Sequence, residues 1–255
     1  RMMLGLLAAD EGEATWNGRR ISRDTLAFGY MPEERGIYMK IPVAEQLVYF
    51  AMLRGMRKAD ARAAAAKWMD RLGVAEYAAK NADKLSKGNQ QKIQLMAALL
   101  SDPELLILDE PLSGLDPINA DLFKGIIREE IAAGKYLIMS SHQMATVEEF
   151  CTDLTILDRS KTVLQGHLND IKRSYGRVHL QLKTESDPAP YIAECGAQIV
   201  TQKEFEYQLK VTGAQQANRL LARLTQAGVP VVLFNLREPS LHEIFVETVG
   251  GESDA

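Results

Sequence analysis

Apolar residues recur with a helical period between residue 43 and about residue 80. They lie three or four positions apart, as on one face of an amphipathic helix, at Leu47, Phe50, Ala51, Leu53, Met56, Ala65, Trp68, Met69 and Leu72. This section predicts two or three helices that form a lobe. Residues 2–9 have the composition of the buried end of another helix, which stops at the acidic turn around Gly12.

Short apolar runs alternate with helical stretches after residue 100. Residues 105–108 are apolar at every position, as expected for a strand covered on both faces. A helical stretch at 118–133 stops at Gly134, and residues 136–139 predict a second buried strand. Strands that alternate with helices indicate a parallel sheet.

A different pattern begins near residue 175. Two short strands at 154–157 and 162–164 predict an antiparallel edge before it. Beyond it the pattern predicts strands at 178–182, near Ile199, at 207–211 and at 229–234, with helices around Tyr191 and at 215–227. We therefore expect two domains, at 1–174 and 175–255, of which the second is a small α+β unit.

Composition narrows the class of protein. The 255 residues are 46% hydrophobic, which is enough for a large core. A net charge of −4 argues against general nucleic-acid binding, since such binding needs many basic side chains. No apolar run approaches the roughly 20 residues that span a bilayer. Cys151 and Cys195 are far apart in sequence, which indicates neither a metal knuckle nor a disulfide framework and favours a reducing compartment.

Reactive side chains follow two of the predicted parallel strands. Asp109 and Glu110 end the first strand, and His142 follows the second. Ligands bind beyond the carboxyl ends of strands in open parallel sheets. If the two strands are neighbours, these three side chains converge on one crevice.

The three side chains suit hydrolysis of a phosphoanhydride, in which a protein supplies positioning and charge. Asp109 would hold Mg²⁺ directly or through water, Glu110 would orient or deprotonate the attacking water, and His142 would sense the terminal phosphate through a hydrogen bond. The alternatives are a solvated strand end for the two carboxylates and a structural role for the histidine.

The segment LSKGNQQK at residues 85–92 precedes this strand and predicts the start of a helix. Free N–H groups and the positive end of a helix dipole suit an anion. Ser86 and Gly88 also fit a simple N-cap with a turn. The phosphate-loop motif G-x-x-x-x-G-K-[ST] is absent from the 255 residues.

These motifs resemble those of the nucleotide-binding subunits of ABC transporters. LSKGNQQK resembles the signature motif, LLILDEP at 105–111 the Walker B strand, SGLD at 113–116 the D-loop and SSHQM at 140–144 the switch-histidine loop. The resemblance covers residues 1 to about 170, with a helical lobe at about 43–100. It implies a P-loop NTPase-like α/β fold with a parallel sheet, and ATP and Mg²⁺ as cofactors.

The resemblance also implies two nucleotide-binding subunits that close head to tail, as a homodimer or a heterodimer. The signature residues would then contact the partner's ATP: Ser86, Lys87, Gly88, Asn89 and Gln90. Asp109, Glu110 and His142 would serve the chain's own ATP, and Asp116 would communicate across the dimer.

Departures from the common family pattern indicate a particular branch of the family. Lys87 and Asn89 stand where Gly and Gln are commonest, which is similar to exporter-type subunits. Glu33 replaces the usual Gln of the Q-loop and can still accept a hydrogen bond from metal-bound water. The alternative for Glu33 is an ordinary exposed carboxylate. Residues 239–247 resemble the tail of the same branch, for which a packing or dimer-stabilising role is our preferred interpretation.

The resemblance implies an ATPase that powers export through a separate membrane permease, from the cytoplasmic face of the cell membrane. The family's phosphate loop directly precedes a helix similar to residues 1–7, so we expect an amino-terminal truncation and a chain inactive by itself. One alternative is a soluble ABC ATPase that acts on DNA or ribosomes. Another is a non-hydrolytic fragment that donates only its signature face.

Overall fold

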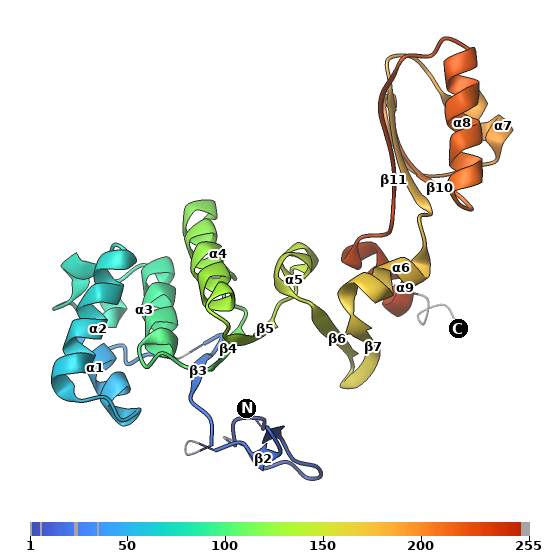
Figure 1. Ribbon diagram of the computed structural model, residues 1–255. Helices are drawn as coiled ribbons and strands as arrows, with labels where there is room; N and C mark the ends of the chain where they lie inside the picture. Colours follow the sequence, from blue (N-terminus) through green and yellow to red (C-terminus); the bar gives the residue numbers. More distant parts are fainter. Residues whose placement is uncertain (1, 6, 23–24, 35, 251–255) are drawn as a thin grey trace. The chain divides into compact units, whose positions relative to one another are not determined.

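The computed structural model describes residues 2–5, 7–22, 25–34 and 36–250. Its contacts divide the chain into an N-terminal unit, Arg1–His142, and a C-terminal unit, Gln143–Ala255. Figure 1 follows the chain through both. The predicted domain boundary at 174/175 falls inside the C-terminal unit and stays a prediction. Residues 251–255 of the second predicted domain lie outside the described residues.

A three-stranded parallel sheet positions the site in the N-terminal unit. Its strands are β3 (Phe28–Met31), β4 (Leu105–Asp109) and β5 (Tyr136–Ser140), in the order β3-β4-β5. Helix α4 (Pro117–Ala132) connects β4 to β5, because parallel strands need a long crossover. The central strand β4 buries its leucines, as its apolar sequence predicts. The predicted parallel sheet is therefore confirmed.

Strand β5 departs from its predicted burial. It pairs only with β4 among the described strands, so it lies at an edge of this sheet. Tyr136 and Ile138, which share one face of the strand, are 58% and 40% exposed. Tyr136 packs edge-on against Trp16, with ring centroids 4.9 Å apart. An apolar run predicts burial only where neighbours cover both faces, and here one face lacks that cover.

The start of the chain also differs from its prediction. Residues 2–5 form turns, and Met2, Met3 and Leu7 are exposed. Leu4 is buried, and position 6 lies outside the described residues. So short a segment gains too few hydrogen bonds to offset helix nucleation. The next residues form a small antiparallel pair, with strands β1 (Thr15–Trp16) and β2 (Arg19–Arg20).

The predicted helical lobe at about 43–100 contains three α-helices and two 3₁₀ turns. They are α1 (Val43–Leu53), α2 (Lys58–Arg71), η1 (Ala75–Tyr77), η2 (Ala82–Lys84) and α3 (Lys87–Leu99). Each α-helix buries one apolar face, which includes Leu47 on α1, Ala65 on α2 and Ile93 on α3.

Helix α3 packs directly on strand β3, and Gly29 permits this contact. A β-carbon at residue 29 would overlap the carbonyl oxygen of Ala98 on α3. The glycine thus fixes how closely the helix that begins at the signature segment approaches the sheet.

The C-terminal unit begins with two helices and a hairpin. Its elements are α5 (Met144–Phe150), β6 (Asp153–Asp158), β7 (Lys161–His167) and α6 (Leu168–Tyr175). The hairpin closes through Arg159 and Ser160, whose φ angles of +46° and +65° suit a tight hairpin turn. Helix α9 (Leu241–Gly250) returns to this part. A cluster of buried side chains joins these elements: Leu154, Leu168, Ile171, Leu241 and Ile244.

The rest of the unit has the order strand–helix–strand–strand–helix–strand. The elements are β8 (His179–Thr184), α7 (Ala189–Cys195), β9 (Gln198–Lys203), β10 (Glu206–Lys210), α8 (Ala214–Gln226) and β11 (Val231–Arg237). The sheet is antiparallel with the order β11-β8-β10-β9, which is a ferredoxin-like arrangement. Figure 1 shows both helices on one face of the sheet.

An ion network links this sheet to α9. The two terminal nitrogens of the Arg237 guanidinium donate to Glu243, at 2.7 and 2.8 Å. Glu243 also accepts from the backbone and hydroxyl of Ser240, at 2.6 and 2.9 Å, and lies 3.3 Å from Nδ1 of His179. The Arg237 hydrogen bonds, helped by those from Ser240, lower the pKa of Glu243 to about 2.

Candidate functional site

The carboxyl ends of the three parallel strands lie at one edge of the sheet. Met31 pairs with Leu108, and Asp109 pairs with Ser140, so the chain leaves all three strands on the same side. Glu33 follows the first of these strands, in an exposed loop. Predicted candidates from three parts of the sequence therefore lie at this edge: Glu33, the pair Asp109 and Glu110, and His142.

Four residues form a hydrogen-bonded acidic network here: Asp109, Glu110, Ser140 and His142. The Ser140 hydroxyl donates to Oδ1 of Asp109 and accepts the backbone N–H of Glu110 at 3.2 Å. Oε1 of Glu110 accepts the backbone N–H of His142 at 2.8 Å and lies 2.9 Å from its Nδ1. The network thus joins both predicted carboxylates to the predicted histidine.

Glu110 has an unusual backbone conformation within this network. Its φ is +49°, in the left-handed region that residues with a β-carbon rarely adopt. Its N–H donates to the carbonyl of Ser140 as well as to the hydroxyl, both at 3.2 Å. Such conformations cost about 1–3 kcal/mol and cluster at functional sites. The strain turns the chain sharply after β4 and directs the Glu110 side chain toward His142.

The acidic network is open toward solvent on one side. The His142 side chain is 69% exposed, whereas that of Glu110 is 16% exposed. With Nδ1 held against Glu110, Nε2 is the nitrogen left for a ligand. Oε2 of Glu110 and Oδ2 of Asp109 have no hydrogen-bond partner among the described residues.

The carboxylates at this edge of the sheet fit a Mg²⁺ site only if substrate phosphates and waters supply the other ligands. Within the described residues, no group of three or more His, Cys, Asp or Glu side chains forms a metal site. Mg²⁺ often binds through one or two carboxylates plus substrate phosphates and waters. Asp109 through Oδ2 fits such a site, and Glu33 lies at the same edge of the sheet.

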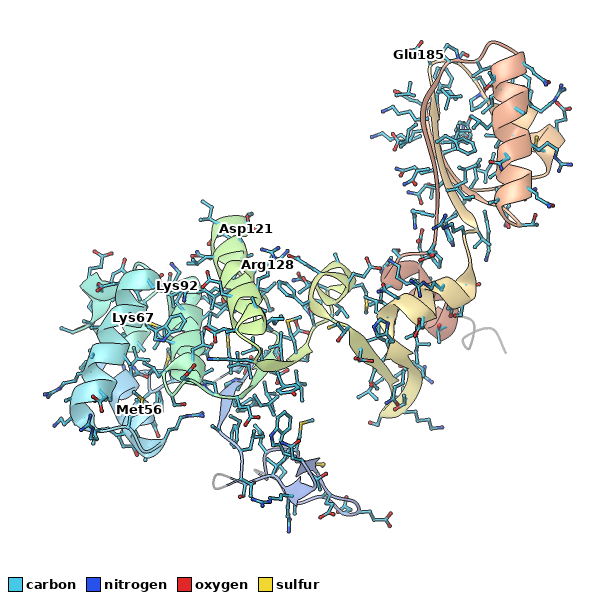
Figure 2. The ribbon with its side chains drawn as sticks, viewed as in Figure 1. Met56, Lys67, Lys92, Asp121, Arg128 and Glu185 are labelled. Atoms are coloured by element: carbon cyan, nitrogen blue, oxygen red, sulfur yellow. The ribbon has the colours of Figure 1, made fainter. Side chains whose placement is uncertain are left out.

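The signature residues form a separate cluster at the start of α3. The Ser86 hydroxyl caps the helix by accepting the Asn89 N–H, although the distance of 3.4 Å is long. A β-carbon at residue 88 would lie 3.6 Å from the Asn119 amide on α4. The first turns of α3 and α4 therefore lie close together. Figure 2 labels Lys92 and Asp121 farther along these two helices.

Two glutamines of the signature segment have structural partners. The Gln90 amide donates to the carbonyls of Ala82 and Leu85, at 3.0 and 3.1 Å. Gln91 donates to the carbonyl of Ser113 in the D-loop segment, at 2.5 Å. The structure thus turns Gln90 toward the preceding turn, and its predicted contact with nucleotide stays a prediction.

The D-loop residue Asp116 caps helix α4. Its Oδ1 accepts the backbone N–H of Asn119 at 3.1 Å, and its Oδ2 accepts from the side-chain amide of the same residue. These bonds lower the pKa of Asp116, with the backbone bond as the largest cause. Lys87 reaches across to this segment, since a β-carbon on Gly114 would lie 3.2 Å from its Nζ. The signature and D-loop candidates therefore lie together.

The sequence did not single out Ser140 or Gln91. Ser140 belongs to the SSHQM segment, but its contacts depend on the strand register that places it opposite Asp109. Pairing the ends of the two predicted strands would have found it. Gln91 lies within the signature segment, and no sequence signal separates its inward amide from that of Gln90.

Comparisons with known proteins identify the family of this chain. Residues 1–113 match the ABC transporter family, and residues 166–249 match the family described as ATP-binding protein DrrA1-3-like, C-terminal domain. A relative from Bacillus subtilis, the uncharacterized ABC transporter ATP-binding protein YhaQ, is 41% identical over 98% of this chain and 84% of its own length.

Two further matches extend the comparison. An uncharacterized ABC transporter ATP-binding protein of Alkalihalophilus pseudofirmus is 42% identical over 98% of this chain and 94% of its own length. The solved structure of an ATP-binding subunit of an ABC transporter has a TM-score of 0.61 and 28% identity, and covers 68% of this chain and 74% of that one. The chain therefore belongs to the ATP-binding proteins of ABC transporters, in the branch with a DrrA-like C-terminal domain.

Proposed function

We propose that this chain is the ATP-hydrolysing subunit that powers export through a separate membrane permease. The acidic network at the carboxyl edge of the parallel sheet is the main support. It places an unpaired carboxylate oxygen of Asp109, a strained Glu110 and an exposed His142 within one hydrogen-bonded group. These are among the groups that phosphoanhydride hydrolysis uses on the protein side.

Each group has a separate task in this proposal. Asp109 and Glu33 hold Mg²⁺, partly through water, and the metal neutralises the phosphate charge when ATP is bound. Glu110 orients and deprotonates the attacking water. His142 donates from Nε2 to the terminal phosphate, and its contact with Glu110 links that phosphate to the base.

The signature cluster serves a second ATP, bound to a partner nucleotide-binding subunit. Ser86 and Gly88 lie at the start of a helix, where free N–H groups suit an anion. Lys87, Asn89 and Gln90 complete this proposed contact surface. Asp116 transmits closure across the dimer, which its place beside the signature segment supports.

A nucleotide site of this family is completed by a glycine-rich phosphate loop. No G-x-x-x-x-G-K-[ST] motif is present in the sequence. We therefore propose that the chain by itself binds ATP weakly and does not hydrolyse it.

An exposed apolar patch on the helical lobe suits contact with the permease. It contains Tyr38, Met39, Tyr49, Met52 and Leu53, each at least 42% exposed. Gln46 is buried and shapes the loop of this patch through three hydrogen bonds, which join it to Tyr38 and Ile41. The described helices include none long and apolar enough to cross a membrane. We propose that the chain is cytoplasmic and reaches the inner face of the membrane through the permease.

The C-terminal unit has a packing or dimer-stabilising role in this proposal. The ion network of Arg237 and Glu243 links its ferredoxin-like sheet firmly to helix α9. Its described residues contain no cluster of metal-ligating side chains.

Co-expression with a permease tests the proposed function. We expect a subunit that also carries a phosphate loop to co-purify with the permease from membranes, and its complex to hydrolyse ATP only when Mg²⁺ is present. The 255-residue chain alone should show no micromolar ATP affinity by calorimetry. Recovery with ribosomes or DNA, and not with membranes, would contradict the proposal. If the complex binds ATP without hydrolysing it, the remaining role for this subunit is to contribute its signature residues to the partner's ATP site.

A further inference from the structure

Ser140 occupies the centre of the acidic network, although no functional role follows from its sequence position alone. Its hydroxyl contacts both carboxylate-bearing residues at the end of the neighbouring strand, Asp109 and Glu110. Strand register explains the placement, because Asp109 and Ser140 are paired across β4 and β5.

The direction of both hydrogen bonds is fixed by chemistry. An ionised carboxylate only accepts, so the Ser140 hydroxyl must donate to Oδ1 of Asp109. A backbone N–H only donates, so the same oxygen accepts from Glu110. A hydroxyl can do both at once, which no apolar side chain of similar size can do.

We propose that Ser140 is a positioning residue for the metal and water chemistry of this site, an inference that rests on the proposed function. By holding Oδ1 of Asp109, it restricts the carboxylate to one rotation and presents Oδ2 to Mg²⁺. By accepting the Glu110 N–H, it supports the left-handed backbone from which the base projects.

A purely structural role is a weaker explanation for these contacts. Ser140 is exposed, so water could satisfy its hydroxyl without any protein partner. The backbone pairing of β4 with β5 continues through main-chain atoms and needs no hydroxyl. The side-chain bonds therefore order groups at the strand ends more than they hold the sheet together.

Ser140→Thr and Ser140→Val form a matched pair, because threonine and valine have the same shape and only threonine keeps the hydroxyl. Both are made in a subunit that carries a phosphate loop and is assembled with its permease. The first readout is the affinity for Mn²⁺, followed by electron paramagnetic resonance in the presence of a non-hydrolysable ATP analogue. The second is ATP hydrolysis, resolved into kcat and KM.

We expect Ser140→Val to weaken Mn²⁺ affinity and to lower kcat, each about 10-fold, as the loss of a hydrogen bond to a charged group implies. KM for ATP should change less than about 3-fold, since Ser140 positions groups for the reaction and does not hold the nucleotide. Ser140→Thr should keep both quantities within about 3-fold of the natural subunit.

Equal Mn²⁺ affinity and kcat in the two variants, both near natural values, would overturn the inference. If both variants lose activity equally, Ser140→Ala decides. Impaired metal binding in that variant at an unchanged melting temperature supports the inference, and natural behaviour overturns it. A natural complex that hydrolyses no ATP would instead overturn the proposed function.

Discussion

Two glutamates, one in each unit, lie beside a histidine and have different surroundings. Glu110 lies 2.9 Å from His142, and Glu243 lies 3.3 Å from His179. Glu243 also binds the guanidinium of Arg237 and caps α9 through Ser240, so both of its oxygens have partners. Glu110 uses one oxygen and faces an exposed histidine.

The difference separates a structural carboxylate from one available for chemistry. Around Glu243 the protein supplies a permanent counter-ion, which lowers its pKa to about 2 and keeps it ionised. Around Glu110 the described residues supply no Lys or Arg partner, and the backbone is strained. A closed network stabilises the fold, whereas an open network leaves room for water, metal and phosphate.

Glu110→Gln should have the largest effect of all. In the assembled transporter we expect ATP turnover to fall roughly 100- to 10,000-fold, because glutamine cannot accept a proton from water. The unfolding free energy should change by less than about 1 kcal/mol, since the glutamine oxygen can still accept the His142 N–H. Turnover assays and urea unfolding measure the two quantities, and near-normal turnover would remove Glu110 from the reaction.

Glu243→Gln should show the opposite behaviour. We expect a loss of about 1–3 kcal/mol in the unfolding free energy of the C-terminal unit, because Arg237 is left partly buried without its counter-ion. Urea unfolding followed by circular dichroism measures it. The matched control is Glu247→Gln, whose exposed partner Lys210 also links the sheet to α9 and whose loss should cost less than about 0.5 kcal/mol. Equal losses of unfolding free energy in the two variants would show that the closed network stabilises the fold no more than an exposed ion pair does.

Sequence periodicity predicted the regular elements where neighbours in the fold supply the expected cover. The apolar run of β4, the helical section after residue 43 and the mixed C-terminal elements all appear in the structure. It failed where cover is missing, at the edge strand β5 and at residues 2–5. Burial is a property of tertiary neighbours, which a local pattern does not contain.

The candidate site was also predicted only in part from the sequence. Carboxylates and a histidine at the ends of two parallel strands were expected to converge, and Glu110 and His142 do make contact. The contacts of Ser140 and Gln90 could not be predicted in the same way. They depend on strand register and on which way a side chain turns from its helix, and neither is encoded in residue spacing.

Acid should weaken the C-terminal unit through Glu243, with the smallest expected effect. The folded-state pKa of about 2 lies below the ordinary value of 4.5, so the ionised carboxylate stabilises the fold above pH 4.5. This contribution is lost as pH falls from about 4.5 to about 2, and solvent screening of the partly exposed pair limits it to about 1–2 kcal/mol. Urea unfolding of the natural chain and of Glu243→Gln at pH 6, 4 and 3 would isolate it, since the glutamine variant cannot titrate there. If both chains lose the same stability over this range, other carboxylates account for the acid sensitivity, and the contrast between Glu110 and Glu243 would lose its thermodynamic basis.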